Sequence, residues 1–302
     1  MSALPATVVA AFGRECLARL DGGELLRCQV RGRELQAVCG DRVQVVPNAE
    51  GRDAGSGVVE AIAPRSNEFA RAAQHRKKTL AANLTQVVIL VACEPSFSDE
   101  IICRMLVLAE HAGLPVILVL NKVDLLDHRE RALALLLPFR GLGYPLVELS
   151  GRSDVEPLLP YLAGQRSLLT GQSGMGKSTL VKSLVPDAEV RIREISHFLD
   201  AGKQSTTGSR LYTVAPGSEI IDTPGVADFG LAGFDAPAIA AGFREFDAYR
   251  GQCRFQNCSH LVEPGCALLA AAERNDIHPR RLALFQRIVR AEGLAAAAAG
   301  RR

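Results

Sequence analysis

Eight residues near the middle of the chain, GQSGMGKS at positions 171–178, restrict the possible folds more than any other segment. They fit the pattern G-x-x-x-x-G-K-[ST], with a short apolar run before them (Ser167–Thr170) and an amphipathic segment after them (Lys177–Leu184). A glycine-rich loop between a strand and a helix wraps a phosphate, because backbone N–H groups point inward and the helix start adds positive charge. A chance glycine-rich turn would lack these neighbours. We therefore predict a strand, a phosphate-binding loop and a helix.

Two side chains of this loop have predicted roles in the chemistry. Lys177 reaches the β- and γ-phosphates of a bound nucleotide and counts as a catalytic residue, and the Ser178 hydroxyl binds Mg²⁺. The residues expected to contact the nucleotide in this segment are Gly171, Gln172, Ser173, Gly174, Met175, Gly176, Lys177, Ser178 and Thr179.

A second motif, Asp222-Thr223-Pro224-Gly225, comes directly after the apolar run Glu219–Ile221. An aspartate at the end of a sheet strand beside a phosphate loop can hold the Mg²⁺ shell through water. We therefore predict that Asp222 helps to bind Mg²⁺ and that the N–H of Gly225 meets the γ-phosphate and senses its hydrolysis. By itself the tetrapeptide also fits an ordinary turn, but its place downstream of the phosphate loop favours the nucleotide site.

The tetrapeptide Asn121-Lys122-Val123-Asp124 follows an apolar run that ends at Leu120, and it predicts a guanine pocket. The carboxylate of Asp124 can accept two hydrogen bonds from the N1–H and 2-amino groups of guanine, a pair that adenine cannot supply. We expect Asn121 to tie this loop to the phosphate loop and Lys122 to cover the base, with Val123 in the same nucleotide-binding set. The alternative is that Asp124 caps the next helix. Because α/β sheets bind ligands at the carboxyl ends of their strands, the guanine interpretation is favoured.

The order of these motifs is unusual. Ser150-Gly151, after the apolar run Leu146–Leu149, would place backbone N–H groups on the guanine carbonyl, although a dipeptide is weak support alone. The base-binding segments thus precede the phosphate loop, whereas in ordinary GTPases they follow both phosphate motifs. The site needs strand ends that meet in space and not in sequence order, so we predict a circularly permuted GTPase.

The apolar pattern around these motifs predicts an α/β domain. Gln86–Ala92 and Pro115–Leu120 are continuous β-branched runs, which are typical of strands buried on both faces of a parallel sheet. The residues Asp99–His111 between them have helical spacing, and further strand and helix segments follow, including helical stretches at Arg129–Leu137 and Val155–Leu162. We predict a doubly wound sheet.

The first part of the chain has a different pattern. The short alternating segments Glu24–Val30, Arg42–Val46 and Gly57–Ile62 are separated by turn residues, which predicts a small β-barrel or sandwich. The stretch 64–78, PRSNEFARAAQHRKK, is basic. It is interpreted as a linker or as the rim of a nucleic-acid-binding barrel.

Near the other end, a cysteine cluster predicts a metal site. Cys253, Cys258, His260 and Cys266 lie close together in the sequence and are followed by a helical pattern around Arg280–Ala291. Three thiols and one imidazole suit a single structural Zn²⁺, and four protein ligands leave no open position for catalysis. The alternative, core cysteines beside a surface histidine, is disfavoured by the polar residues between them. The remaining cysteines are scattered and are expected to be buried: Cys16, Cys28, Cys39, Cys93 and Cys103.

Composition excludes several classes of protein. No apolar run approaches the roughly 20 residues of a membrane span, and the N-terminus does not resemble a secretory signal. With a formal net charge of +2 and aromatic residues at 5%, neither strong charge nor base stacking identifies a partner. We expect a cytoplasmic monomer that binds no membrane.

Together, the order NKVD, GQSGMGKST, DTPG and the segment CRFQNCSHLVEPGC resemble the circularly permuted GTPases of small ribosomal subunit biogenesis, the RsgA (YjeQ) family. The resemblance spans nearly the whole chain. It implies an OB-like, RNA-binding barrel over residues 1–80, a permuted P-loop GTPase domain with a parallel sheet over 81–235, and a helical zinc-binding domain over 236–302. It also implies late maturation of the 30S subunit, contact with 16S rRNA through the first and last domains, and GTP hydrolysis that the ribosome stimulates.

One segment departs from the family pattern. Members usually carry a switch like G-x-H-T-T-T, and here residues 202–207 are GKQSTT. Thr206 matches the central threonine, so the resemblance assigns it a role in sensing Mg²⁺ and in catalysis. Gln204 occupies the usual histidine position, and Val226 follows DTPG where many GTPases carry a water-orienting glutamine. Gln204 is therefore a candidate catalytic residue, with a solvent-exposed polar side chain as the alternative.

The sequence thus predicts an enzyme that hydrolyses GTP to GDP and phosphate, slowly until a partner orders the switch. A rival of another class is an RNA-binding assembly module that uses GTP only as a structural ligand. A third interpretation, a P-loop ATPase, is opposed by Asn121 and Asp124.

Overall fold

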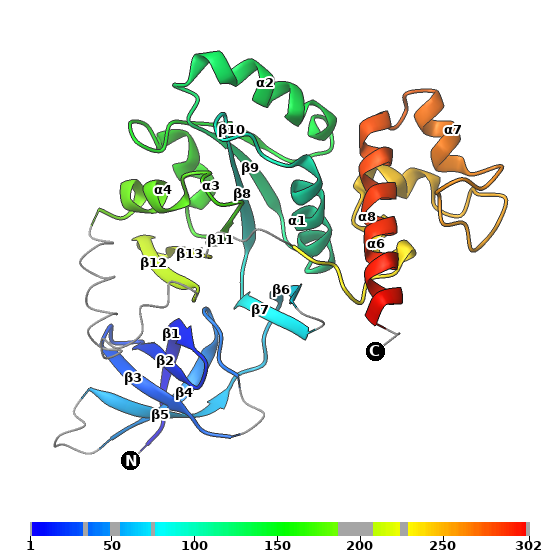
Figure 1. The fold of residues 1–302 in the computed structure, drawn as a ribbon. Helices are drawn as coiled ribbons and strands as arrows, with labels where there is room; N and C mark the ends of the chain where they lie inside the picture. Colours follow the sequence, from blue (N-terminus) through cyan, green and yellow to red (C-terminus); the bar gives the residue numbers. More distant parts are fainter. Residues whose placement is uncertain are drawn as a thin grey trace.

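The structure, a computed structural model, describes residues 2–32, 36–48, 55–73, 76–186, 208–223 and 229–299. Three parts follow one another along the chain in Figure 1: a β-barrel, a central sheet covered by helices, and a group of C-terminal helices. The predicted fold class is confirmed.

In the part of the barrel that the structure describes there are five strands: β1 (Leu4–Phe12), β2 (Glu15–Leu20), β3 (Leu25–Val30), β4 (Arg42–Pro47) and β5 (Ser56–Ile62). They lie in the order β1-β2-β3-β5-β4, and β4 pairs back onto β1 to close the barrel. β3 and β5 are parallel, while the other neighbours are antiparallel. Alternate side chains point inward and build a small apolar core of their own, which is the basis of the alternation seen in the sequence.

The basic stretch 64–78 is not a linker. Most of it belongs to a separate two-stranded antiparallel sheet of β6 (Glu68–Ala73) and β7 (Arg76–Ala82), which does not pair with the barrel strands. Phe69 is fully buried and Leu80 nearly so, and both belong to the main core of the α/β part. The interpretation as a linker was wrong. It was based on the many basic residues of the stretch, and it did not take into account the apolar residues that pack into the core.

Within the described residues, six strands build the central sheet: β8 (Gln86–Ala92), β9 (Val116–Asn121), β10 (Leu146–Glu148), β11 (Arg166–Thr170), β12 (Arg210–Ala215) and β13 (Ser218–Asp222). They lie in the order β10-β9-β8-β11-β13-β12, and all neighbours are parallel except β12 and β13. β8 and β9 are buried at every position, as their continuous apolar runs predicted. β12 was not predicted, because its sequence RLYTVA mixes polar and apolar residues.

Helices cover this sheet in Figure 1: α1 (Asp99–His111), α2 (Leu126–Leu136), α3 (Leu159–Leu162) and α4 (Lys177–Leu184), with 3-10 turns η1 (Leu137–Phe139) and η2 (Glu156–Leu158). α1 and α4 begin and end at the predicted residues. The helix predicted over 155–162 is instead a 3-10 turn followed by a single α-helical turn. Pro157 and Pro160 lack the N–H groups that a longer regular helix requires.

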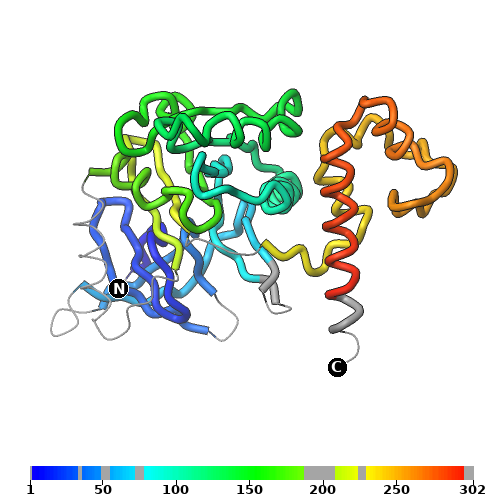
Figure 2. The backbone as a smooth tube through the Cα atoms, turned by 45° about the horizontal axis from the view of Figure 1, so that its top comes forward, coloured from blue at the N-terminus to red at the C-terminus, as the bar shows by residue number. Residues whose placement is uncertain are grey.

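The barrel and the central sheet are joined edge to edge. β1 pairs with β12 at Ala10 and Arg210, so that the two parts share one 11-stranded sheet. The tube in Figure 2 shows the barrel strands beside the yellow-green strands of the central sheet. β9, β11 and β13 run parallel, so that their carboxyl ends lie at the same edge of the sheet, which is where α/β sheets bind ligands.

The C-terminal part contains α6 (Ala236–Ala241), η3 (Arg244–Tyr249), α7 (Ala267–Glu273) and α8 (Pro279–Ala299). α8 lies beside α1 in both ribbon and tube views, and ion pairs join Arg104 to Glu292 and Arg280 to Asp99. α8 covers the helical pattern around Arg280–Ala291 and extends through the alanines that follow it to Ala299, because alanine is the best helix former. Across the described ranges, none of the helices combines the length and apolar character needed to cross a bilayer.

Candidate nucleotide site and metal cluster

One cavity of about 990 Å³ gathers residues of the base-binding and phosphate-binding motifs. The predicted residues that line it are Asn121, Lys122, Asp124, Ser150, Gly151, Ser173, Gly174, Gly176, Lys177, Ser178, Thr179 and Asp222. Motifs that are out of the usual sequence order therefore meet in one place. The site depends on which strand ends are neighbours in the sheet, and not on the order in which the chain visits them.

The phosphate loop is shaped by close contacts that only glycine permits. Gly176 has φ +94°, and a Cβ there would lie 2.4 Å from Asn121 Nδ2; at Gly171 a Cβ would lie 2.3 Å from the Leu90 carbonyl oxygen. α4 begins directly after the loop, at Lys177. The Lys177 ammonium is buried and donates to the carbonyl oxygens of Gly171 at 2.7 Å and Gln172 at 2.8 Å. Burial lowers the pKa of Lys177, an effect that the charge of Asp222 opposes.

Asp222 stands at the end of β13 and lines the cavity. Its Oδ1 is buried and has no hydrogen-bond partner among the described residues. Burial raises the pKa of Asp222 to about 6, while the charges of Lys177 and Arg210 act in the opposite direction. The next residue, Thr223, donates from its hydroxyl to the Leu169 carbonyl at 2.9 Å and so ties this strand end to β11. A buried oxygen without a partner is suited to a cation or to the water of a cation's shell.

Asn121 joins three loops through its buried side-chain amide. Its Nδ2 donates to the Met175 carbonyl at 2.9 Å, and its Oδ1 accepts from the N–H groups of Gly151 and Lys122, each at 2.8 Å. The Lys122 ammonium crosses the same gap and donates to the carbonyls of Gly174 at 2.9 Å and Glu94 at 2.6 Å. The base-binding loop and the phosphate loop are therefore held together as one unit.

Asp124 presents an exposed carboxylate at the cavity wall. The Ser150 hydroxyl donates to its Oδ1 at 2.5 Å. This hydrogen bond lowers the pKa of Asp124, and the nearby charges of Arg152 and Lys122 lower it further. An ionised carboxylate accepts hydrogen bonds and donates none, so it suits a ligand edge that carries two adjacent N–H donors.

Several other predicted residues have different positions. Val123, Gly171, Gln172 and Met175 are not among the residues that line the cavity. The Gln172 side chain instead accepts from the Ser98 N–H at 2.7 Å, at the start of α1, and Met175 is buried in the core. The remaining candidates, Gln204, Thr206 and Gly225, lie outside the described residues.

Sequence reasoning missed several residues of the cavity wall. They are Leu125, Arg152, Val181, Lys182, Gly208, Arg210, Tyr212 and Thr223. Arg210 and Tyr212 come from β12, which carries no recognisable motif, so that nothing in the sequence marked them. Arg152 follows Ser150-Gly151 directly, and this adjacency was a signal that could have found it.

The predicted metal ligands meet in the C-terminal part. The ligand atoms of Cys253, Cys258, His260 and Cys266 all lie within 4.8 Å of one another. His260 Nδ1 is 3.5 Å from Cys253 Sγ and 3.3 Å from Cys266 Sγ, and the two sulfurs are 4.0 Å apart. Zn–S bonds of about 2.3 Å and Zn–N bonds of about 2.0 Å would set tetrahedral neighbours roughly 3.5 to 3.8 Å apart. The cluster can bind a metal ion and is compatible with zinc.

Two residues that were not predicted hold this cluster in shape. The Glu263 carboxylate accepts from the N–H and hydroxyl of Ser259 at 2.8 and 2.5 Å, and from the N–H groups of Leu261 and Val262. These hydrogen bonds, led by that of the Ser259 hydroxyl, lower the pKa of Glu263 to about 2. Gln286 on α8 donates to the carbonyl of His260 at 3.0 Å. The ligand loop is therefore organised from within and fastened to the last helix.

A model of the protein family described as RsgA GTPase matches residues 62–232, more than half of the chain. The chain belongs to the RsgA GTPase family. It is a GTP-hydrolysing enzyme, as its motifs predicted, and the family resemblance inferred from them is confirmed.

Relatives and solved structures agree with this family. The chain is 48% identical to the small ribosomal subunit biogenesis GTPase RsgA of Nitrosospira multiformis, over 93% of this chain and 89% of that protein. It is 43% identical to the protein of the same name from Nitrosomonas europaea, over 96% and 92%. The fold is similar to the crystal structure of YjeQ from Thermotoga maritima, with TM-score 0.72, 28% identity and coverage of 96% and 98%. It is also similar to YloQ, described as a circularly permuted GTPase, with TM-score 0.70, 22% identity and coverage of 96% and 95%.

Proposed function

We propose that this protein binds the small ribosomal subunit late in its maturation and hydrolyses GTP there, with turnover that the subunit stimulates. The relatives that are 48% and 43% identical are named for small ribosomal subunit biogenesis, which supports the choice of partner. The proposal that the nucleotide is GTP depends on one observation. The carboxylate of Asp124, oriented by Ser150 at 2.5 Å, shares a cavity with the phosphate loop.

Guanine recognition follows from the charge and direction of Asp124. Ionised at neutral pH, it would accept from the N1–H and 2-amino groups of guanine, and adenine offers no such pair. Asn121 holds the base loop to the phosphate loop through Met175 and to the loop after β10 through Gly151, so that base and phosphates would bind at a fixed separation. Lys122 would cover the base, and the N–H groups of Ser150-Gly151 would face the guanine carbonyl.

In this proposal the loop 171–179, and Lys177 in particular, binds the phosphates. The Lys177 ammonium is buried with a lowered pKa, so an anion beside it would stabilise its charged form strongly. The first N–H groups of α4 would add positive charge at the same point.

Mg²⁺ fits the phosphate end of the cavity, since Asp222 Oδ1 is buried without a partner among the described residues. We propose that Ser178 and Thr206 bind the ion and that Asp222 holds its water shell. When bound, Mg²⁺ neutralises the charge that develops on the phosphate oxygens. Gly225 would donate its N–H to the γ-phosphate.

Water positioning is proposed for Gln204. Val226 has no polar group to orient water, whereas an amide can accept from the attacking water and donate to a phosphate oxygen. Turnover would remain slow until the ribosomal partner brings Gln204 and Thr206 to the γ-phosphate, because phosphoryl transfer depends almost entirely on positioning and electrostatics.

The other parts of the chain have proposed roles in binding RNA. We propose one structural Zn²⁺ at the cysteine-histidine cluster, and contact of the barrel (1–80) and the zinc domain (236–302) with 16S rRNA on the 30S subunit. The GTPase domain between them would span 81–235. The proposed partner places the protein, as a monomer, in the cytoplasm.

Single-turnover hydrolysis of GTP, with and without purified small ribosomal subunits, tests this function. We expect the rate to rise at least tenfold with subunits, and Lys177→Ala to abolish hydrolysis under both conditions. Equal rates with and without subunits, together with tight GTP-dependent binding to RNA, would instead support an RNA-binding assembly module that uses GTP as a structural ligand.

A further inference from the structure

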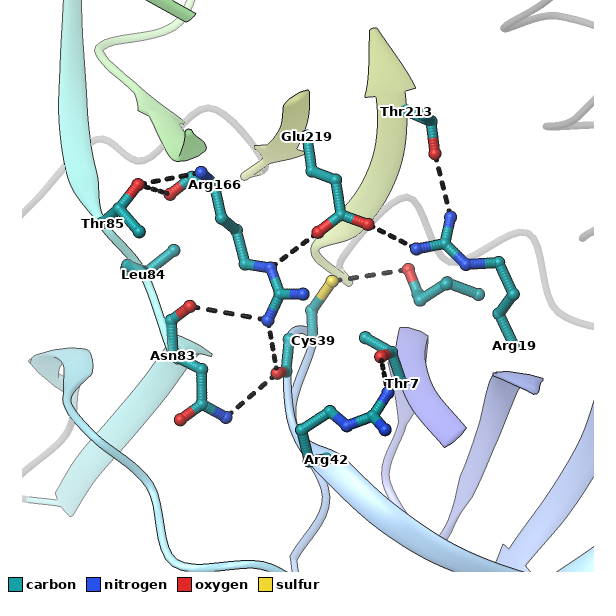
Figure 3. Close-up of polar contacts among 12 residues, drawn as sticks. Thr7, Arg19, Cys39, Arg42, Asn83, Leu84, Thr85, Arg166, Thr213 and Glu219 are labelled. Atoms are coloured by element: carbon teal, nitrogen blue, oxygen red, sulfur yellow. Dashed lines mark hydrogen bonds and ion pairs between the residues drawn. The ribbon is translucent and has the colours of Figure 1, made fainter. Parts of the chain in front are cut away.

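A network of two arginines and one glutamate joins the barrel to the central sheet (Figure 3). Glu219, near the start of β13, is ion-paired through Oε1 with Arg19 of barrel strand β2 and through Oε2 with Arg166 of β11, the latter at 2.7 Å. Arg19 also donates from Nη1 to the Thr213 hydroxyl on β12 at 2.9 Å. One barrel side chain thus holds both strands of the β12–β13 hairpin.

The surroundings keep this network rigid and charged. Arg166 donates from Nη1 to the Gly40 carbonyl at 3.2 Å, and the Asn83 side chain donates to the same carbonyl at 3.1 Å. Gly40 has φ +92°, and a Cβ there would lie 2.2 Å from the Ala82 carbonyl oxygen, so the backbones approach closely. Burial would raise the pKa of Glu219, but Arg166 and Arg19 outweigh burial and lower it.

The hairpin that Arg19 holds extends into the nucleotide cavity. Thr213 is paired with Glu219 at the Arg19 end, and Arg210 is paired with Asp222 at the other end. Three residue-to-residue steps along the strand, with two residues between, separate the two ends, which is about 10 Å. Arg210 and Asp222 both line the cavity, and Arg210 also pairs with Ala10 of the barrel. The barrel is therefore fastened to the hairpin near both ends.

We propose that Arg19 is a positioning residue for GTP hydrolysis, which holds the β12–β13 hairpin so that Arg210 and Asp222 stay in place in the nucleotide cavity. The backbone contact alone is a weak restraint, because β1 and β12 share one residue pair. The planar guanidinium of Arg19 can bond Glu219 and Thr213 together, which a lysine ammonium does less well. The inference rests on the proposed nucleotide site, and it does not depend on the proposed ribosomal partner.

The hairpin carries residues of the phosphate end of the cavity, while the base loop and the phosphate loop follow β9 and β11. Loosening the hairpin should therefore slow hydrolysis and leave nucleotide affinity almost unchanged. We expect Arg19→Ala to lower the kcat of intrinsic GTP hydrolysis about fivefold or more, with KM for GTP and Kd for GDP within twofold of wild type. KM reports affinity where chemistry is slow relative to dissociation, as proposed for intrinsic hydrolysis, and Kd for GDP measures affinity independently of that condition.

Arg27→Ala is the matched control. Arg27 belongs to the same barrel and pairs with Glu15 at 3.0 Å, within the barrel. Its loss should leave kcat and KM unchanged. Arg19→Lys should restore part of the lost rate, because the charge facing Glu219 is kept.

Thr213→Val removes only the hydroxyl that Arg19 bonds. We expect a smaller fall in kcat, and no further fall when this change is added to Arg19→Ala, since contacting residues are not additive. Melting curves establish that each variant folds, and if Arg19→Ala does not, then Arg19→Lys and Thr213→Val decide. The proposal is overturned if the Arg19 variants keep the wild-type kcat, if Arg27→Ala lowers it equally, or if KM rises while kcat stays constant.

Discussion

Exchanging Asp124 for asparagine should shift the base preference of this GTPase from guanine towards xanthine. The carboxylate is exposed, accepts from Ser150 Oγ at 2.5 Å, and has a lowered pKa because of that bond, so it is ionised at neutral pH. An asparagine amide keeps one acceptor oxygen but turns an NH₂ donor towards the 2-amino group of guanine. Xanthine carries a carbonyl at that position and can accept from the amide.

The magnitude follows from the hydrogen bonds that change. A hydrogen bond to a charged group contributes about 1.5 to 3 kcal/mol. Asp124 is exposed and already accepts a hydrogen bond from the Ser150 hydroxyl. The lower half of this range therefore applies to each of its two hydrogen bonds to guanine. The asparagine variant would lose one of the two hydrogen bonds to guanine, weaken the other, and place its NH₂ donor against the 2-amino donor of the base. Together these changes should cost roughly 2 to 3 kcal/mol of binding free energy, which raises Kd for GDP about 30- to 150-fold.

Competition between GDP and XDP for a bound fluorescent nucleotide measures this change. Asp127→Asn is the control, since Asp127 lies in the first turn of α2 and does not line the cavity. We expect wild-type affinities for that control variant. Unchanged GDP affinity in Asp124→Asn would remove Asp124 from the base pocket and would leave it a role in shaping the loop.

Further changes have equally direct readouts. Cys258→Ser should lose stoichiometric zinc by metal analysis and lower the melting temperature of the C-terminal part, with GDP binding largely intact; retention of one zinc at wild-type affinity would contradict the proposed ligands. Gly176→Ala, whose Cβ would lie 2.4 Å from Asn121 Nδ2 at a residue with φ +94°, should weaken GDP binding at least tenfold in titrations, and unaltered affinity would show that the loop can adjust. Gln204→Ala should lower the ribosome-stimulated kcat about tenfold, or 1.4 kcal/mol, with GTP affinity nearly unchanged; equal stimulated rates would shift water positioning to a group of the partner.

Strands and helices could be predicted from the sequence where the segment itself has a clear hydrophobic period or a known motif. The strands β8 and β9 are buried on both faces, so that their apolar runs are continuous, and α1 and α4 carry clear helical spacing; all were predicted close to their observed bounds. The basic hairpin β6–β7 was not predicted, because its charged side chains outnumber the apolar residues that pack into the core. β12 was not predicted for a related reason, since a strand that mixes polar and apolar residues has no distinctive hydrophobic period.

The candidate site divides in the same way. The loop 171–178, the base motif ending at Asp124 and the ligand spacing of the cysteine cluster can be read from the sequence, because each is a short segment whose chemistry depends on neighbours along the chain. Arg210, Tyr212 and Glu263 could not be found in this way. Their roles depend on which strand or loop folds against them.

The sequence by itself determined the three parts of this protein, the phosphate and base motifs and the cysteine-histidine cluster, because periodicity and motif spacing are local properties of the chain. Only the tertiary structure decided that a barrel strand pairs with β12 and that Glu219 lies between Arg19 and Arg166. Arg19 and Glu219 are far apart along the chain, and no local pattern encodes such a partner. It arises when the barrel and the central sheet meet and partly bury opposite charges together, and this contact connects the barrel to the nucleotide site.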